Sequence, residues 1–459
     1  MKDGFDHLQA DVVVAGAGIG GLTAARTALE QGASVLVIEK APDIGGSAAV
    51  SGGSAWTAAN VDAWLSVQPG GDAAMGQALV DNYLDGVAWY ESLGLQVEEQ
   101  LDPTPYKFAR YVHAFRPDSR TFMNDLAASV EAAGGTILTS TGLRSIQLGR
   151  DGGVAGVEAR GGGRTVHVAA GAVVLATGGF QASPDLRARY FGRWAHHVIV
   201  RGNAYSTGDG FLAALEAGAG TAGPFGRFYG HMIPAPPAET GVQNFASVKP
   251  DFSQYSVFVN LHGQRFDDEF LGDEVTVHAV VHQPEALCFI IFDERVRKLR
   301  ATGMGERPGA VDRRMENIRN AGGEILEAPD LETLAAEMAR CWGVTPGPLM
   351  ATLDEHNAAA AADDLTMLSV PRSGGLQPLD SPPFRAIRCL PGATFTYGGA
   401  RSNERAQILD LAGEPIPGLF AAGADVGGLY TRGYTGGLSV GVAYGRIAGR
   451  EAAALVQRE

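Results

Sequence analysis

The sequence predicts an α/β protein in which a parallel-sheet domain is interrupted by an α+β insertion. Three observations predict this arrangement: a strand, helix, strand pattern over residues 11–40, apolar strands over residues 154–180, and a return to apolar strands after residue 383. From about residue 222 the intervening sequence is rich in proline, aromatic residues and histidine. We therefore expect a first domain of residues 1–221 and 383–459, and a capping or substrate domain of residues 222–382.

The first strand and helix carry a nucleotide-binding signature. Gly16, Gly18 and Gly21 form GxGxxG between an apolar strand and a helical pattern, and Glu39 ends the next strand. The glycines permit a tight turn and let a pyrophosphate approach the helix amino terminus. A carboxylate at Glu39 can accept hydrogen bonds from ribose hydroxyls. The pattern predicts a Rossmann-like domain that binds an adenine dinucleotide.

Composition and charge exclude several classes of function. The chain has 459 residues, which predicts two or three domains, and its 36 basic and 51 acidic residues give a net charge of −15, so we expect no nucleic-acid partner. No run of 18 apolar residues occurs, so no membrane span is expected. The amino-terminal segment lacks an export signal, and Cys288, Cys341 and Cys389 form no CxxC motif. We expect a cytoplasmic protein without a metal site.

Several motifs in one order resemble a known family. They are DVVVAGAGIGGLTAA, IEKAPDIGGSAAVSGGS, AVVLATGGF, STGDGFLAALEAGA, FVNLHGQRFDDE and IPGLFAAGADVGG. This succession, which covers nearly the whole chain, resembles the flavoprotein family of fumarate reductase and succinate dehydrogenase, particularly its branch similar to 3-ketosteroid delta-1-dehydrogenase and tricarballylate dehydrogenase. The resemblance implies FAD in a Rossmann-like domain, with a cap over the isoalloxazine.

The resemblance also implies which residues bind FAD. A helix that begins near Leu438 would direct its amino terminus at the flavin. Members with covalent flavin carry a histidine in the segment equivalent to GGSAAVSGGS, and this sequence has none there, so we expect noncovalent FAD. With only one GxGxxG, no separate NAD(P)H site is expected. The implied cofactor residues are Gly16, Gly18, Gly21, Glu39, Lys40, Gly46, Ser47, Ser51, Gly52, Gly53, Ala176, Thr177, Gly178, Asp209, Gly423, Asp425 and Leu438.

Family members move a hydride between flavin N5 and the carbon β to a carbonyl or carboxylate, while a side chain moves a proton at the α carbon. In the fumarate-reducing enzymes the proton-transferring arginine lies eight residues after the arginine of GxRFxxE. The same count from Arg265 gives Asp273. A carboxylate under an apolar cap has a raised pKa and can abstract an acidic proton. The alternatives are a solvated acidic turn, a one-residue slip that selects Glu274, or a nearby tyrosine that takes the α proton in place of Asp273.

A second catalytic position follows from the segment YTGG. The fumarate enzymes hold a substrate carboxylate with a histidine in HTxGG and an arginine in RxGG, and this chain has Phe395 and Tyr434 there. Tyr434 resembles the tyrosine of YPGxG in the ketosteroid dehydrogenases, where the phenol and a backbone N–H hold the ketone oxygen. We expect the N–H of Gly437 to join it.

The resemblance therefore implies a dehydrogenase that desaturates a cyclic or steroid-like ketone and passes electrons to a quinone or an electron-transfer partner. The alternatives are a fumarate or enoate reductase that runs the reverse reaction, and a flavin protein that serves as a redox sensor. His231 and Tyr229 can line the substrate cavity or belong to the core. Arg116 and Arg432 can bind a substrate carboxylate if there is one.

Overall fold

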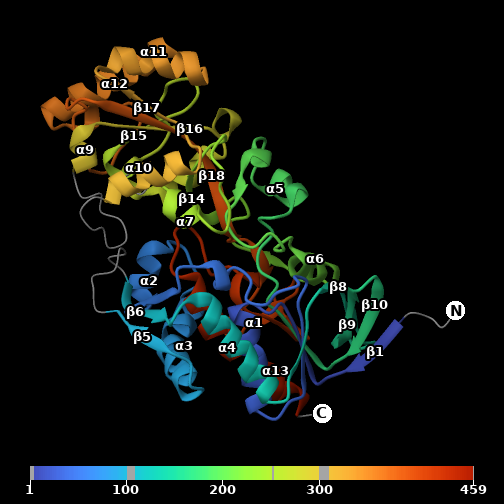
Figure 1. The fold of residues 1–459 in the computed structure, drawn as a ribbon. Coiled ribbons are helices and arrows are strands. Elements are labelled where there is room, and N and C mark those ends of the chain that lie inside the picture. Colours follow the sequence, from blue (N-terminus) through green and yellow to red (C-terminus); the bar gives the residue numbers. More distant parts are fainter. Residues whose placement is uncertain (1–4, 101–108, 251–252, 299–309, 458–459) are drawn as a thin grey trace.

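The structure is a computed structural model that describes residues 5–100, 109–250, 253–298 and 310–457. Figure 1 shows a larger part that carries both ends of the described chain, and a second part above it that is built mainly from the middle of the sequence. Helices and strands alternate in both parts, so the predicted mixed α/β class is confirmed. Among the described residues, no helix has the length and apolar character needed to cross a membrane.

A six-stranded sheet forms the core of the larger part, in the order β20-β21-β11-β2-β3-β7. Its strands are parallel except for β20. All residues of β2, β3 and β11 are buried, as expected for parallel strands covered on both faces. The bounds are β2 Val12–Ala15, β3 Val35–Ile38, β7 Thr136–Leu138, β11 Ala172–Leu175, β20 Gln407–Leu409 and β21 Pro415–Ala421.

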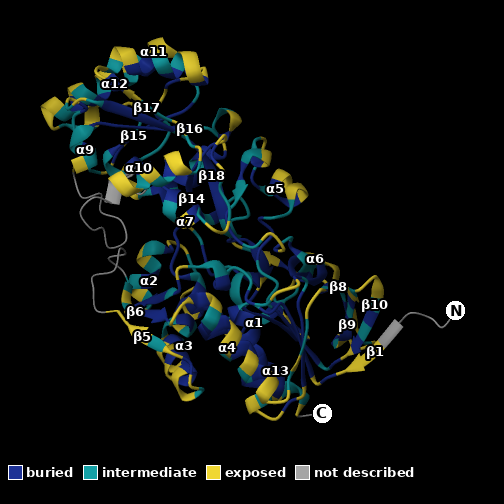
Figure 2. Ribbon diagram, viewed as in Figure 1, coloured by how far each residue is buried: buried dark blue, intermediate teal, exposed yellow. Residues whose placement is uncertain are grey.

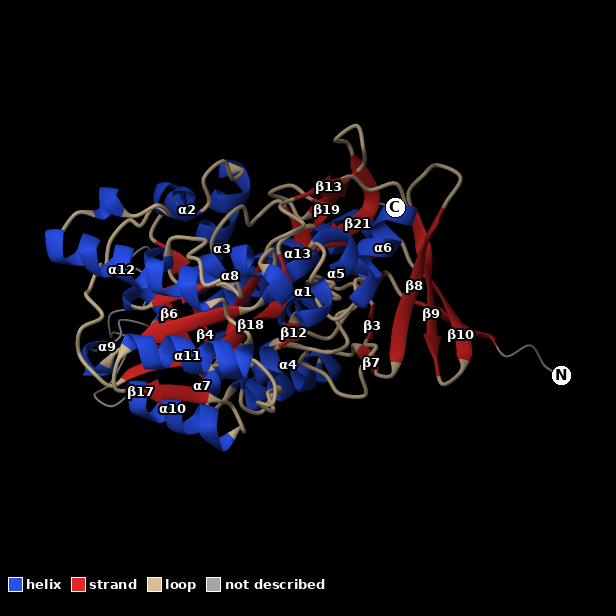
Figure 3. Ribbon diagram, turned by 90° about the horizontal axis from the view of Figure 1, so that it is seen from above, coloured by secondary structure: helices blue, strands red, loops and turns tan. Residues whose placement is uncertain are grey.

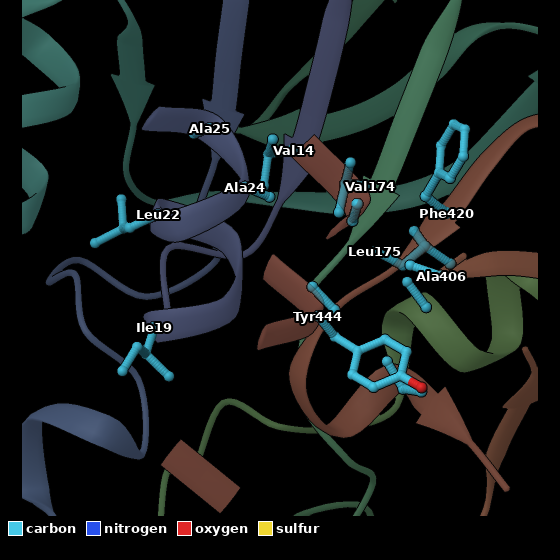
Figure 4. Packing of buried hydrophobic residues seen from close by; sticks show 14 of the residues in the cluster. Val14, Ile19, Leu22, Ala24, Ala25, Val174, Leu175, Ala406, Phe420 and Tyr444 are labelled. Carbon is cyan, nitrogen blue, oxygen red and sulfur yellow. The ribbon is translucent and has the colours of Figure 1, made fainter. Parts of the chain in front are cut away.

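Helices α1 (Ile19–Glu30) and α13 (Gly437–Val456) pack against this sheet and against each other. Glycine allows their close contact, because a Cβ at Gly449 would lie 2.4 Å from the Ala24 carbonyl oxygen. Figure 4 shows Val14 and Val174 of the strands in one cluster with Tyr444 of α13. Helix α3 (Ala73–Ser92) packs on α13, and α4 (Ser119–Ala132) packs on α1.

Smaller elements complete the larger part. A four-stranded sheet, β1-β10-β9-β8, extends to one side of the molecule, as Figure 3 shows. Two three-stranded sheets have the orders β13-β19-β22 and β4-β6-β5. The strands are β1 Phe5–Gln9, β4 Ser54–Ala58, β5 Val97–Glu99, β6 Ala109–Phe115, β8 Thr141–Leu148, β9 Val154–Gly161, β10 Arg164–Ala169, β13 Thr221–Ala222, β19 Gly399–Arg401 and β22 Val426–Gly427; the helices are α2 Val61–Val67, α5 Pro184–Tyr190 and α6 Asp209–Glu216.

The cap is built on a second mixed sheet, β12-β18-β16-β15, in which β14 and β17 also pair with β18. Figure 2 shows buried strands inside the cap and exposed residues on its helices. The strands are β12 Ile199–Val200, β14 Phe228–Pro234, β15 Val257–Val259, β16 Cys288–Phe292, β17 Ile325–Ala328 and β18 Phe384–Thr396; the helices are α7 Phe245–Val248, α8 Asp273–Val280, α9 Glu294–Lys298, α10 Ala310–Asn320, α11 Leu331–Trp342 and α12 Pro346–Ala362.

The predicted division into two domains, residues 1–221 with 383–459 and residues 222–382, stays a prediction. Strand pairing bears on its second boundary, at residue 383. Strand β18, which the boundary at 383 places in the first domain, is the strand to which β12, β14, β16 and β17 pair. The sequence pattern identified β18 as a strand but gave no information on its partners. Pairing favours a return to the larger part after about residue 396.

Candidate active site

A cavity of about 1180 Å³, including its open mouth, lies between the two parts. Most of the predicted cofactor and catalytic residues line it, although they come from segments far apart in the sequence. Those on its wall are Gly16, Gly18, Glu39, Lys40, Gly46, Ser47, Ser51, Ala176, Thr177, Gly178, Asp209, Gly423, Tyr434, Gly437 and Leu438. Gly21, Gly52, Gly53, Asp273 and Asp425 are not among the residues of this wall.

The three glycines of the first turn serve different purposes. Gly16 has φ of +108°, and a Cβ there would lie 2.2 Å from the carbonyl oxygen of Ala176, so only glycine fits. A Cβ at Gly21 would lie 1.9 Å from the carbonyl oxygen of Gly16, so Gly21 lets the helix pack on the turn. Gly18 has no atom within 4 Å of that position and faces open space on the cavity wall.

Glu39 is fixed by two backbone groups at the end of β3. Its carboxylate accepts hydrogen bonds from the N–H groups of Ala17 and Ala41, each at 2.7 Å. The side chain is buried, and this burial raises the pKa of Glu39, while the two N–H donors oppose the rise. Each oxygen keeps a further lone pair for a hydroxyl group in the cavity. This geometry suits the predicted contact with a ribose.

Replacing Glu39 by glutamine is expected to weaken FAD binding by about 10- to 100-fold, because a charged hydrogen bond contributes about 1.5–3 kcal/mol. The new amide NH₂ would also face a backbone N–H of Ala17 or Ala41. Equilibrium titration of flavin-free protein with FAD measures the affinity. Asp43→Asn, an exposed change four residues away, is the control. Equal affinities of both variants and the wild type would remove Glu39 from the cofactor site.

Lys40 and Asp209 meet across the cavity wall. Lys40 Nζ lies 2.9 Å from Asp209 Oδ2 and also donates to Thr207 Oγ1. Thr207 in turn donates to Asp209 Oδ1 at 2.7 Å. Residues 40 and 209 therefore form one hydrogen-bonded group that joins the end of β3 to the start of α6.

Asp425 supports the wall from behind. It is buried and accepts hydrogen bonds from the backbone N–H groups of Thr177 and Gly178 and from the Thr177 hydroxyl. Burial raises the pKa of Asp425 to about 7, although these donors oppose the rise. Asp425 thus holds the turn after β11 in place.

The glycine pair of the segment before β4 lies outside the cavity wall. Gly53, with φ of +73°, sits against Ser119, and Gly52 faces open space.

The stability of the flavin-free protein is expected to fall as the pH rises from about 4 to about 7. Folded Asp425 keeps a proton up to about pH 7, whereas the unfolded carboxyl loses it near 3.8. The folded state therefore binds more protons in this interval, which makes the slope of stability against pH negative. Between pH 5 and pH 8, the fall in the free energy of unfolding should be smaller by about 2–3 kcal/mol in Asp425→Asn than in the wild type. Urea unfolding at both pH values measures the difference; an unchanged slope would contradict the assignment.

A cluster of aromatic side chains forms the cap end of the cavity. The rings of Tyr434 and Tyr229 are stacked, with centroids 3.6 Å apart, and Trp56 meets Tyr434 edge-on at 5.2 Å. The backbone N–H of Gly437, the first residue of α13, donates to the phenol oxygen of Tyr434 at 2.9 Å. The structure thus brings Tyr434 and Gly437 together, with the N–H directed at the phenol. Burial raises the pKa of Tyr434, which keeps the phenol protonated.

Asp273 is buried at the start of α8, away from the cavity wall, and contacts His231. His231 Nδ1 lies 2.8 Å from Asp273 Oδ2, and Nε2 lies 3.3 Å from the Tyr229 hydroxyl and 3.4 Å from Glu274 Oε1. Burial raises the pKa of Asp273. Of these hydrogen-bonded residues, Tyr229 is the one that lines the cavity. Asp273 is therefore joined to the site through His231.

The acidic turn before α8 is held by buried ion pairs. Glu269 is fully buried and binds Arg265, with Nη2 to Oε2 at 2.6 Å, and Arg372, with Nη1 to Oε2 at 3.2 Å. It also accepts the N–H of Phe258 at 3.0 Å. Arg265 thus has a structural role, and the paired turn fixes the first residue of α8, which is Asp273.

Two further polar residues line the cavity and were missed in the sequence. Gln181 is fully buried. In the described part of the chain, neither its two amide atoms nor the buried Oγ1 of Thr394 has a hydrogen-bond partner. Such groups are costly unless a ligand satisfies them. The isoalloxazine of FAD has carbonyl acceptors and an N–H donor, so these residues fit it. Gln181 directly follows AVVLATGGF, which is the only signal that could have found it.

Comparison with known proteins identifies the family of this chain. The model of the FAD binding domain family matches residues 11–439. A probable fumarate reductase of Shewanella frigidimarina is 26% identical over an alignment of 463 positions, which covers 96% of this chain and 74% of that protein. The 4-oxocyclohexanecarboxylate 2-dehydrogenase of Sinomonas cyclohexanicum is 27% identical over an alignment of 567 positions, which covers 96% of this chain and 92% of that protein. The chain spans only 50% and 47% of the length of two further relatives.

Solved structures show the same fold. The 3-ketosteroid delta1-dehydrogenase of Sterolibacterium denitrificans has a TM-score of 0.77 at 20% identity, over 97% of this chain and 99% of that one. An open flavocytochrome c3 fumarate reductase has a TM-score of 0.71 at 24% identity, over 98% and 79%. The family model confirms the predicted resemblance, and its relatives agree with it: the chain belongs to the FAD binding domain family of fumarate reductase and succinate dehydrogenase flavoproteins, and it is an FAD-dependent oxidoreductase acting on CH–CH bonds.

Proposed function

We propose that the protein introduces an α,β double bond into a cyclic ketone. The observation that carries this proposal is the pair of stacked phenols at the cavity, Tyr434 and Tyr229, each with its own hydrogen-bonded support. FAD, when bound, supplies the acceptor for the β hydride. The residues of the chain bind the ketone oxygen and move the α proton.

Tyr434 is the donor to the ketone oxygen in this proposal. The N–H of Gly437 donates to its oxygen, so the phenol proton is directed elsewhere and can serve the substrate. Accepting that bond polarises the phenol and makes it a better donor. As the α proton leaves, negative charge gathers on the ketone oxygen, and a donor already in position stabilises it. The raised pKa of Tyr434 keeps the phenol protonated at neutral pH.

Tyr229 takes the α proton in this proposal, with His231 and Asp273 behind it. In this proposal the Nδ1–H of His231 donates a hydrogen bond to an ionised Asp273, which leaves Nε2 free to accept the proton of the Tyr229 hydroxyl. The α proton of the ketone moves to the Tyr229 oxygen as that hydroxyl proton moves to Nε2. Glu274, 3.4 Å from Nε2, stabilises the resulting imidazolium. Asp273 is then a positioning residue.

The nature of the site favours a ketone over a dicarboxylate. Phe395 and Tyr434 occupy the positions at which the fumarate-reducing relatives place a histidine and an arginine. Two proteins similar to this chain are named for ketone dehydrogenation, one on 4-oxocyclohexanecarboxylate and one on 3-ketosteroids. We also propose that FAD is noncovalent and that a quinone or an electron-transfer partner reoxidises it. The three cysteines are free, which supports the further proposal that the protein is cytoplasmic.

Anaerobic mixing of the holoenzyme with a panel of saturated cyclic ketones, steroids, enones and fumarate tests the proposal. Loss of the oxidised-flavin absorbance with a saturated ketone is the expected result, with formation of the matching enone. Rapid reoxidation of the reduced flavin by fumarate would overturn it in favour of a fumarate reductase. A flavin that responds to no member of the panel would favour the redox sensor.

A further inference from the structure

Arg201 is a buried cation that the reaction outlined above does not use. It directly follows β12, and its backbone N–H donates to the carbonyl oxygen of Ala393 at 2.9 Å. Only 4% of the residue is exposed, yet Nε and Nη1 are buried without a hydrogen-bond partner among the residues that the structure describes. Burying a guanidinium group with two unsatisfied N–H donors is unfavourable even beside aromatic rings, so its retention is explained best by an anion that binds there.

The surroundings of Arg201 place it beside the substrate end of the cavity. Its guanidinium carbon lies 5.5 Å from the ring centroid of Tyr229 and 4.6 Å from that of Phe245. The stem passes over Gly392, where a Cβ would lie 3.2 Å from Arg201 Cδ. Tyr229 lines the cavity, so Arg201 packs directly behind a wall residue.

The nearby acids do not neutralise Arg201 by direct contact. Asp273 uses Oδ2 to bind His231, and Glu269 is committed to Arg265 and Arg372. Among the described residues, no carboxylate lies within ion-pair distance of Arg201. Burial raises the pKa values of the Tyr229, Tyr434 and Asp273 side chains, and the charge of Arg201 partly opposes that rise. The two arginines that the sequence offered for a carboxylate are placed differently: Arg116 pairs with Glu98 and Arg432 is exposed.

We infer that Arg201 binds a carboxylate carried by the ketone substrate, so that the preferred substrate is a small keto acid. This inference rests on the proposed function. The Arg201 guanidinium carbon lies 5.5 Å from the centroid of the Tyr229 ring, and the centroid of the Tyr434 ring lies 3.6 Å from the same point. The guanidinium carbon and the Tyr434 centroid are therefore at most about 9.1 Å apart. This upper bound is compatible with one small molecule that places a ketone oxygen at Tyr434 and a carboxylate at Arg201, such as a single ring that carries both groups. The planar guanidinium suits two-point binding of a carboxylate.

Substrate selectivity tests the inference. For the wild-type holoenzyme, kcat/KM is expected to be at least 10-fold higher for 4-oxocyclohexanecarboxylate than for its neutral methyl ester. Arg201→Met, which keeps an apolar stem, should lower this ratio by about 10- to 100-fold, the range for loss of charged hydrogen bonds. Arg201→Lys should retain part of it. A ratio unchanged in Arg201→Met, or one that falls instead in Arg116→Met or Arg432→Met, would overturn the inference.

A second measurement separates a ligand-binding role from a structural one. Removing an unpaired buried charge should leave the melting temperature of the ligand-free holoenzyme equal or higher in Arg201→Met, whereas loss of a structural partner would lower it. Cyclohexanecarboxylate should raise the melting temperature of the wild type but not of the variant, and cyclohexanecarboxamide should raise neither. If this carboxylate response depends on Arg201 while no ketone reduces the flavin, the anion site stands and the proposed function fails. A carboxylate response equal in both proteins would refute the anion site.

Discussion

Replacing Tyr229 by phenylalanine is expected to lower the rate of flavin reduction by a ketone about 10²- to 10⁴-fold, the range for loss of a general acid–base group. The variant removes one hydroxyl and keeps the ring that stacks on Tyr434. That hydroxyl is the atom that joins the cavity to His231. The proton would then have no acceptor next to the substrate.

Single-turnover flavin reduction under anaerobic conditions measures this effect without a contribution from reoxidation. Tyr397→Phe is a matched control. Tyr397 packs against the neighbouring rings of Phe395 and Tyr430, and its buried hydroxyl has no hydrogen-bond partner among the described residues. Exchange of the ketone α proton with solvent gives a second reading that reports proton transfer alone. A Tyr229→Phe variant that reduces its flavin and exchanges the α proton at wild-type rates would assign the proton transfer to another group.

Most of the residues expected to bind the cofactor lie on one cavity wall, and the sequence could predict this because their placement depends on local chemistry. Gly16 requires a positive φ next to Ala176, and Glu39 must follow a buried strand to reach the first turn. Gly16 and Glu39 both lie within the strand, helix, strand segment of residues 11–40, so a pattern of strand, glycines, helix and acid is sufficient to find them. Lys40 and Asp209, although far apart in sequence, were found by resemblance and meet in an ion pair.

The substrate half was less accessible from the sequence because it depends on packing between distant strands. Counting along the chain led to Asp273, but the count contains no information on which side chain faces the cavity. Pairing of β14 with β18 places Tyr229 on the wall and His231 behind it. Arg201 gave no signal at all, since an arginine after a short strand becomes unusual only when its burial and its lack of partners are known.

Replacing Tyr434 by phenylalanine is expected to lower kcat/KM for a ketone by about 2–4 kcal/mol of transition-state stabilisation, the range found for removal of one donor to an oxyanion. The variant loses the phenol proton that would bind the ketone oxygen. It also leaves the N–H of Gly437 without the oxygen that now accepts it. The ring itself, held between Tyr229 and Trp56, is kept.

The loss should fall mainly on kcat. A neutral ketone oxygen accepts only a modest hydrogen bond, whereas the enolate oxygen that forms as the α proton leaves accepts a much stronger one, so the phenol contributes most in the transition state. Steady-state kinetics therefore should show a large fall in kcat with a small change in KM. Binding of substituted phenolates, which mimic the enolate, should weaken in parallel. A variant that loses affinity for the ketone but keeps kcat would show that Tyr434 only binds substrate; wild-type kinetics would remove it from the mechanism altogether.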